Sequence, residues 1–234
     1  MITIYAQGRD LCVKSSFEHK ERCRAIPFGG WDSLNRVWRY PASPNIAGEI
    51  ERVFDGIPKS ADAVYDKLLA LYYTQSELAA VKTASELPDI PSKTSAWLHQ
   101  RQAYHFVKDL PAGALFMAMR TGKSKVVVDL VVNKGHQKVL ILCPLSVIDV
   151  WPEEFKKHAL PGPMTLLALS NGQSVSKRAK AVTQALDIGQ ATRSPAVIVM
   201  NYEAAWREPM ASLLLGQTWD LVVLDESHRT KAPG

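Results

Sequence analysis

The sequence of 234 residues contains little cysteine and no long apolar run. Its three cysteines, Cys12, Cys23 and Cys143, are odd in number and lack paired metal-ligand spacing, which fits a reducing compartment and burial as small hydrophobic residues. No apolar stretch approaches the roughly 20 residues that a transmembrane helix needs. The first residues also lack the basic and apolar segments of a secretory signal. We therefore expect a cytoplasmic chain with no membrane partner.

The sequence has no internal repeat, no low-complexity segment and no strong charge of one sign. Its formal net charge is only +5 at pH 7. Residues 1–90 are nearly neutral, with 11 Lys and Arg against 12 Asp and Glu, whereas residues 91–234 carry 17 against 11. This local surplus is compatible with a polyanionic partner, but on charge alone an ordinary solvated surface is the better explanation. Charge alone therefore does not identify a partner.

A segment rich in Pro, Ser and Thr separates two regions of different character. Residues 87–96 are expected to be a linker. Before them, residues 1–86 show short alternating strands and helical periodicity, which predicts a small α+β domain. The turn-forming residues Asp32-Ser-Leu-Asn35 lie between two aromatic-bearing segments and predict a hairpin. Trp31 and Trp38 are expected to pack in the core of this domain.

After the linker, apolar strands alternate with helical segments. The apolar runs are residues 114–119, 138–143, 164–170, 196–200 and 221–224. Continuous apolar strands of this kind are typical of a parallel sheet that is covered by helices on both faces, so residues 97–234 are predicted to form an α/β domain. Ligands of such sheets bind beyond the carboxyl ends of the strands. The functional residues should therefore lie in the loops that follow the strands.

The first such loop contains the end of a phosphate-binding motif. Thr121-Gly-Lys-Ser124 matches the end of the pattern G-x-x-x-x-G-K-[ST], although Met117 occupies the place of the first glycine. Gly122 lets the backbone approach phosphate oxygens, Lys123 reaches the terminal phosphates, and the hydroxyl of Ser124 is suited to Mg²⁺. So short a match is common by chance. Its place between an apolar run and an apolar helix favours a phosphate site.

Two carboxylates follow the last apolar strand directly. In a nucleotide-hydrolysing site, Asp225 would hold Mg²⁺ through its water shell, while Glu226 would position the attacking water and accept its proton. The alternative is an ordinary surface turn, in which acidic residues are common. The phosphate loop and the acidic pair occur in the expected chain order, and together they favour the nucleotide site.

These motifs are similar to those of a known family. Asp225-Glu-Ser-His228 resembles the D-E-x-H box of superfamily-two helicases. Its continuation, His228-Arg-Thr-Lys-Ala-Pro233, resembles the version of this box in Swi/Snf-type DNA translocases. Leu98-His-Gln-Arg-Gln-Ala103 is similar to the family segment whose glutamine, here Gln100, reads adenine. Residues 97–234 are thus identified as a first RecA-like lobe of a P-loop NTPase. The lobe would be truncated after the DExH box, and a second RecA-like lobe would be missing.

The resemblance implies an ATP- and Mg²⁺-dependent hydrolase that acts on duplex or branched DNA, with only weak activity in this fragment. The implied nucleotide-binding residues are Gln100, Arg120, Thr121, Gly122, Lys123 and Ser124, and Ser124 and Asp225 would bind Mg²⁺. The implied catalytic residues are Lys123, Asp225, Glu226 and His228, and His228 would link the site to adjacent machinery by hydrogen bonds. Arg120 departs from the family pattern, in which many members have glycine, so its role is open.

Two further segments resemble family motifs near the nucleic acid. Leu140–Val147, followed by Trp151, resembles motif Ia, and Val197–Glu203 is similar to the next motif. The resemblance implies that these loops line a nucleic-acid groove. The implied contact residues are Pro144, Ser146, Asn201 and Tyr202. Plain connecting loops are the alternative, and Trp151 is expected to be a core aromatic residue.

The N-terminal region has a fainter resemblance. Phe28-Gly-Gly-Trp31, Val37-Trp38 and Tyr40-Pro41 resemble the HARP-type module of some annealing helicases, which implies recognition of branched DNA. An alternative function is therefore a non-catalytic DNA- or protein-binding module acting through residues 1–86. A third possibility, another phosphate-loop enzyme such as a kinase, is disfavoured by Gln100 and by the acidic box.

Overall fold

The computed structural model describes residues 1–170, 172 and 174–227, so the predicted site residue His228 lies outside the described residues. The chain divides into two compact units, Met1–Thr83 and Ala84–Gly234. Among the helices in the described part of the chain, none is both long and apolar enough to cross a membrane. Each unit has its own hydrophobic core and is described separately.

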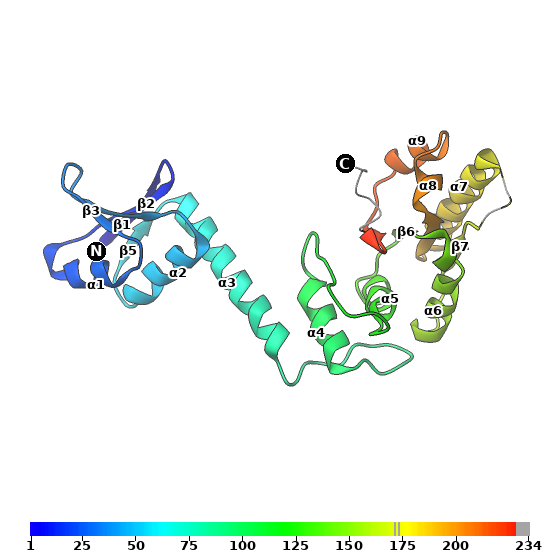
Figure 1. Cartoon of the computed structure of the whole chain (residues 1–234), viewed down its shortest axis with the longest axis horizontal. Coiled ribbons are helices and arrows are strands. Elements are labelled where there is room, and N and C mark those ends of the chain that lie inside the picture. The colour runs from blue at the N-terminus through cyan, green and yellow to red at the C-terminus, as the bar shows by residue number, and fades with distance from the viewer. Residues whose placement is uncertain (171, 173, 228–234) are drawn as a thin grey trace. The chain divides into compact units, whose positions relative to one another are not determined.

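The N-terminal unit is a five-stranded sheet with helices, drawn in blue and cyan in Figure 1. Its strands are β1 (Ile2–Gln7), β2 (Asp10–Lys14), β3 (Gly30–Asp32), β4 (Val37–Pro41) and β5 (Lys59–Ala61), in the order β3-β4-β2-β1-β5. The helices are η1 (Phe17–His19), α1 (Lys20–Ala25), α2 (Pro44–Val53) and α3 (Ala63–Thr83). All pairs are antiparallel except β1 with β5. The predicted small α+β fold is confirmed.

The predicted hairpin is present, but one of its tryptophans lies outside the core. Strands β3 and β4 pair through Trp31 and Trp38, whose rings lie 5.6 Å apart. Trp38 packs against the core, whereas Trp31 is 53% exposed. The expectation that Trp31 is a core residue was therefore wrong. Because β3 is the edge strand of the sheet, Trp31 contacts the ring of Trp38 and leaves its other side to solvent.

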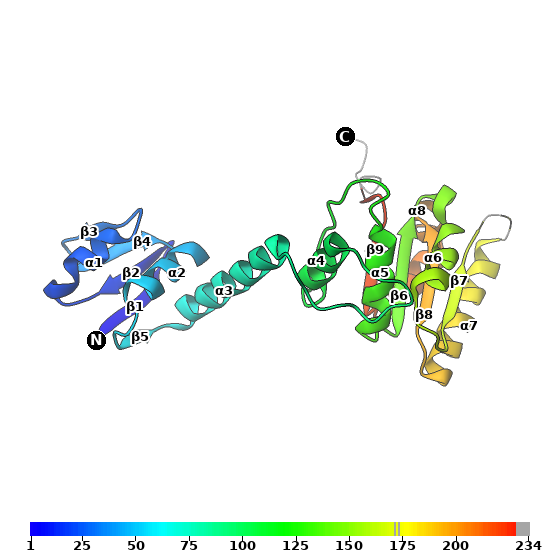
Figure 2. The same ribbon diagram turned by 90° about the horizontal axis from the view of Figure 1, so that it is seen from below.

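The C-terminal unit contains a four-stranded parallel sheet, visible in Figure 2. Its strands are β6 (Lys138–Cys143), β7 (Thr165–Ala168), β8 (Ala196–Asn201) and β9 (Leu221–Leu224), in the order β7-β8-β6-β9. Its helices are α4 (Leu98–Val107), α5 (Lys123–Asn133), η2 (Leu145–Val147), α6 (Val150–His158), α7 (Val175–Thr192), α8 (Tyr202–Ala205) and α9 (Met210–Leu215). All three strand pairs are parallel. The predicted α/β class, a RecA-like lobe preceded by a small α+β domain, is confirmed.

The central strands β6 and β8 are buried on both faces, which explains why they are apolar except for Lys138 and Asn201 at their ends. On β6, Ile141 belongs to the core formed with α5 and α6, where Trp151 is also buried as expected. Its neighbour Leu142 belongs to the opposite core, formed with α7, α8 and α9. Because successive side chains of a strand point to opposite faces, a strand between two helical layers has to be apolar at every position.

The strand predicted before the phosphate loop is absent. Residues 113–118 have no regular secondary structure, and the side chain of Phe116 is 99% exposed. A segment forms a strand only when a neighbouring strand satisfies its peptide groups. In the described part of the chain, β9 pairs only with β6, and no strand lies between β9 and residues 113–118. An apolar run alone was therefore insufficient to predict this strand.

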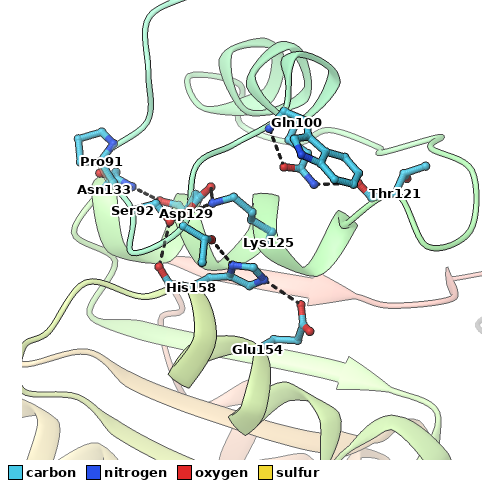
Figure 3. Close-up of polar contacts among 11 residues, drawn as sticks. Pro91, Ser92, Gln100, Thr121, Lys125, Asp129, Asn133, Glu154 and His158 are labelled. Carbon is cyan, nitrogen blue, oxygen red and sulfur yellow. Dashed lines mark hydrogen bonds and ion pairs between the residues drawn. The ribbon is translucent and has the colours of Figure 1, made fainter.

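Part of the segment predicted as a linker packs within the C-terminal unit. In this strap (residues 91–94), the hydroxyl of Ser92 donates to the main-chain oxygen of His158 at 2.9 Å (Figure 3). The amide of Lys93 donates to the same oxygen, also at 2.9 Å. On the other side, Lys125 Nζ donates to Ser92 Oγ at 2.9 Å. The strap thereby connects α6, which ends at His158, to the first turn of α5.

The strap also covers a buried ion pair. Lys125 and Asp129, one helical turn apart on α5, lie 3.0 Å from each other with side chains 3% and 2% exposed. Together with Ser92, the two carboxylate oxygens of Asp129 satisfy the ammonium group of Lys125. A buried charge is tolerated only when it is paired and hydrogen-bonded, so this pair depends on the strap and on the helix.

Burial of His158 beside the strap is expected to make the C-terminal unit less stable in mild acid. Burial lowers the pKa of His158 below its ordinary value of 6.5, an effect that Glu154 partly opposes and that Lys125 and Lys157 reinforce. At a pH between the lowered pKa of His158 in the folded chain and its ordinary pKa in the unfolded chain, the unfolded chain binds more protons. The free energy of unfolding should therefore fall as the pH drops below about 6.5. Denaturation of the C-terminal unit at pH 7.5 and pH 5.5 measures this decline.

The matched variant for this prediction is His158→Gln, which keeps a polar side chain and removes the titration. Its stability should depend less on pH than that of the unmodified chain. The difference between the two proteins isolates His158 from His136, whose pKa burial also lowers. An identical decline in both proteins would show that His158 does not titrate in this range.

Candidate functional site

The phosphate loop is built around a glycine that the backbone requires. Gly122 precedes α5 and has φ +83°, in the left-handed region that favours glycine. A Cβ atom at this position would lie 2.3 Å from Nε2 of Gln100. The absence of a side chain therefore serves two purposes: it permits the turn into α5, and it leaves room for Gln100 beside the loop.

Gln100 connects α4 to this loop. Its Nε2 donates to the main-chain oxygen of Thr121 at 3.0 Å, and its Oε1 accepts from the amide of Trp97 at 3.0 Å (Figure 3). His99 Nε2 lies 2.9 Å from the same oxygen of Thr121. With 6% of its surface exposed, Gln100 makes its contacts with the protein itself. The structure thus gives Gln100 a bracing contact in the loop, while adenine recognition stays a prediction.

The lysine of the motif is folded onto its own loop. Lys123 Nζ donates to the main-chain oxygens of Met117 and Ala118, both at 3.1 Å. The hydroxyl of Thr121 donates to the same Ala118 oxygen at 2.7 Å. Main-chain oxygens are weaker partners for an ammonium group than phosphate oxygens are. These contacts hold the ammonium group in place, and an incoming phosphate could replace them.

Two other predicted residues lie next to this lysine in sequence. Arg120 is exposed and has φ +61°, so its side chain leaves the loop at a left-handed position. Ser124 is partly buried in the first turn of α5. The N-terminus of a helix provides free amide groups and a favourable dipole for anions. The first turn of α5 is accordingly suited to phosphate.

The acidic pair emerges at the carboxyl end of the sheet. The amide of Asp225 donates to the main-chain oxygen of Leu142 at 2.8 Å, which extends the pairing of β9 with β6 by one residue. Glu226 follows with φ +54°, so the chain turns sharply after Asp225. The two carboxylates therefore leave the end of β9 within a single tight turn.

Electrostatics connect this pair to the phosphate loop. Burial raises the pKa of Asp225, and the neighbouring Glu226 raises it further. The backbone amide of Glu226, the ammonium group of Lys123 and the indole of Trp151 act in the opposite direction and lower this pKa. The positive charge of Lys123 therefore favours the ionised form of the Asp225 carboxyl group. This interaction joins two motifs that lie about a hundred residues apart in the sequence.

Residues predicted to contact nucleic acid differ in their exposure. Ser146 is exposed, whereas Pro144, Asn201 and Tyr202 are buried. Asn201 Nδ2 donates to the carboxylate of Glu203 at 2.7 Å. Ser146 therefore has a side chain available to a nucleic acid, while the other three shape the loops from within. Their contact with nucleic acid stays a prediction.

Tyr202 contacts the acidic turn, which sequence reasoning missed. Its hydroxyl donates to the main-chain oxygen of Asp225 at 2.7 Å. The tyrosine is 5% exposed, and burial raises its pKa to about 12. Because the contact involves a main-chain oxygen, the identity of residue 225 gives no sign of it. Only the adjacency of strand ends in a parallel sheet hinted at such a contact.

The residues at this end of the sheet fit a magnesium-bound nucleotide. Gly122 permits the left-handed turn into α5, and the side chains of Ser124, Asp225 and Glu226 have the oxygen atoms that Mg²⁺ prefers as ligands. Among the residues that the structure describes, no group of three His, Cys, Asp or Glu could hold a metal ion by itself. Two carboxylates suit Mg²⁺, which usually completes its coordination with water and phosphate oxygens.

Comparisons with known proteins show which family the chain resembles. A family model described as "SNF2-related domain" matches residues 19–233. Among curated proteins, the chain is similar to "Probable global transactivator" of Orgyia pseudotsugata multicapsid polyhedrosis virus, with 36% identity over 121 residues. The match covers 51% of this chain and 22% of the viral protein, so the chain corresponds to a small part of that relative.

Proposed function

The chain belongs to the family of SNF2-related domains, and from this membership we propose that Ala84–Gly234 is the ATP-binding lobe of a DNA-dependent translocase. The family supports an ATPase of the helicase-like class in general. The observation that carries the more specific proposal is the position of the acidic pair, which follows β9 at the carboxyl end of the parallel sheet, where such sheets bind their ligands. The positive charge of Lys123 acts to lower the pKa of Asp225 there, which is consistent with this proposal.

In the proposed site, each group acts on one part of the nucleotide. The amides at the start of α5 bind phosphate oxygens, and Lys123 exchanges the oxygens of Met117 and Ala118 for the terminal phosphates. Ser124 and Asp225 hold Mg²⁺, which when bound neutralises charge on the phosphates. Glu226 orients the attacking water and accepts its proton. The exposed Arg120 is placed to contribute positive charge to the same loop.

We propose that DNA binds along the loops that follow β6 and β8. The support is the exposed hydroxyl of Ser146, the free surface around η2 and the positive surplus of residues 91–234. Contacts of this type hold phosphates without reading bases. Full hydrolysis would need a second RecA-like lobe, because an arginine supplied from outside the first lobe contributes on the order of 10³ to 10⁵ in rate in related sites.

A filter-binding assay with the whole chain tests this function against its alternative. Forked and linear duplex DNA are each titrated with the chain, with and without MgATP. Under the proposal, nucleotide changes the affinity for DNA, because the loops that contact DNA and the nucleotide site share the same end of the sheet. Tight fork binding that ignores nucleotide would instead favour a non-catalytic DNA-binding module. The exposed Trp31 of the N-terminal unit is compatible with that alternative.

A further inference from the structure

Tyr202 and Asp225 follow two strands that do not pair with each other. Strand β8 leads into Tyr202, β9 leads into Asp225, and β6 lies between the two strands. The side chain of Tyr202 spans the end of β6 and donates its hydroxyl to the main-chain oxygen of Asp225 at 2.7 Å. We propose that Tyr202 is a positioning residue that sets the acidic turn for magnesium, an inference that rests on the proposed function.

The main chain of Asp225 is restrained from both sides. Its amide is bound to the oxygen of Leu142, and its oxygen is bound by Tyr202. The next residue, Glu226, adopts φ +54°, a left-handed conformation that is unfavourable for a residue with a Cβ. Such a conformation persists only where the surroundings enforce it. The hydroxyl of Tyr202 is one of the groups that enforce it.

The loop of Tyr202 is itself rigidly held. Asn201 Nδ2 donates to the carboxylate of Glu203 at 2.7 Å, which fixes the start of α8. Tyr202, Ala204 and Ala205 are buried in the core beneath the sheet. The tyrosine is therefore unsuited to stacking on a base, and its hydroxyl is already bound to Asp225. The hydroxyl, which is its only polar side-chain group, binds the main chain of the acidic turn.

The first experiment measures the magnesium-dependent part of nucleotide affinity. Binding of a fluorescent ATP analogue is measured with Mg²⁺ and with EDTA. In Tyr202→Phe, the gain in affinity that Mg²⁺ provides should shrink by about fivefold to tenfold, the range expected for one hydrogen bond, while affinity in EDTA stays within about twofold. A purely structural role would lower both affinities. A full magnesium gain in Tyr202→Phe would overturn the inference.

Tyr40→Phe is the matched control. Tyr40 is also buried, and its hydroxyl also donates to a main-chain oxygen, that of Cys23 at 2.9 Å, but it lies in the N-terminal unit. Removing the Tyr40 hydroxyl shows how nucleotide affinity responds to the loss of a buried hydroxyl outside the proposed site. We expect both affinities of this variant to match those of the unmodified chain.

The second experiment uses amide hydrogen exchange of the chain without nucleotide or metal. A peptide covering residues 221–227 should exchange faster in Tyr202→Phe, whereas a peptide covering residues 138–143 should not change. Unchanged exchange at residues 221–227 would overturn the inference independently of any ligand. If Mg²⁺ gives no gain even in the unmodified chain, the proposed function fails. Faster exchange at residues 221–227 would then still support the restraint of the turn by Tyr202.

Discussion

Replacement of Lys123 by alanine is expected to lower the affinity of the chain for MgATP by about 10- to 150-fold. A hydrogen bond to a charged group contributes about 1.5–3 kcal/mol, which corresponds to this range. The fold should stay intact, because the hydrogen bonds of Lys123 Nζ are made to the main-chain oxygens of Met117 and Ala118 within its own loop. Titration with a fluorescent ATP analogue measures the loss, and thermal denaturation checks the fold.

The control for this variant is Lys134→Ala, which removes a lysine at the other end of the same helix. Lys134 Nζ contacts the carboxylate of Asp109 at 2.8 Å on the surface. Its removal changes the net charge by the same amount but should leave ATP affinity unchanged. Equal affinities in Lys123→Ala and the unmodified chain would contradict the phosphate-binding role of the loop.

The largest effect on stability is expected for Asp129→Ala. This variant leaves the ammonium group of Lys125 buried with only Ser92 as a partner, and the loss of one member of a buried ion pair typically costs about 3–5 kcal/mol. Chemical denaturation, followed by hydrogen exchange of peptides from β6 and β8, measures the change in the C-terminal unit. The N-terminal unit has a separate core and serves as an internal reference.

Two further variants show whether burial of the ion pair causes the loss of stability expected for Asp129→Ala. Asp109→Ala breaks the exposed pair with Lys134 on the same helix and should have little effect, because solvent screens exposed ion pairs. The double variant Lys125→Met/Asp129→Leu should recover most of the lost stability, since an apolar pair can replace a buried ion pair. Equal destabilisation by Asp109→Ala and Asp129→Ala would contradict this explanation.

The sequence predicted the parallel sheet well because burial on both faces leaves a clear pattern. Strand β6 was predicted with its observed bounds, since the five residues after Lys138 are buried between two helical layers and are all apolar. Gly122 was also identifiable, because a left-handed turn before a helix calls for glycine and the motif places it there. In both cases the structure restricts which type of residue can occupy the position, so the residue type reveals the structure.

Features that depend on partners far along the chain were not predictable. Residues 114–118 are as apolar as a strand, but no strand pairs with them in the part of the chain that the structure describes. The strap consists of ordinary turn-forming residues, and its attachment is made through the main-chain oxygen of His158. The contact of Tyr202 with Asp225 likewise uses a main-chain oxygen. Such contacts place no demand on the identity of one partner, so the sequence contains no sign of them.

The central claim is that the phosphate loop and the acidic pair bind one magnesium-bound nucleotide. A crystal structure of the chain with Mg²⁺ and a non-hydrolysable ATP analogue tests it most directly. The account predicts a single ion between Ser124 and Asp225, with Lys123 moved from the oxygens of Met117 and Ala118 to the phosphates. Phosphates bound elsewhere, or an Asp225 carboxylate too distant to share the ion through water, would contradict it.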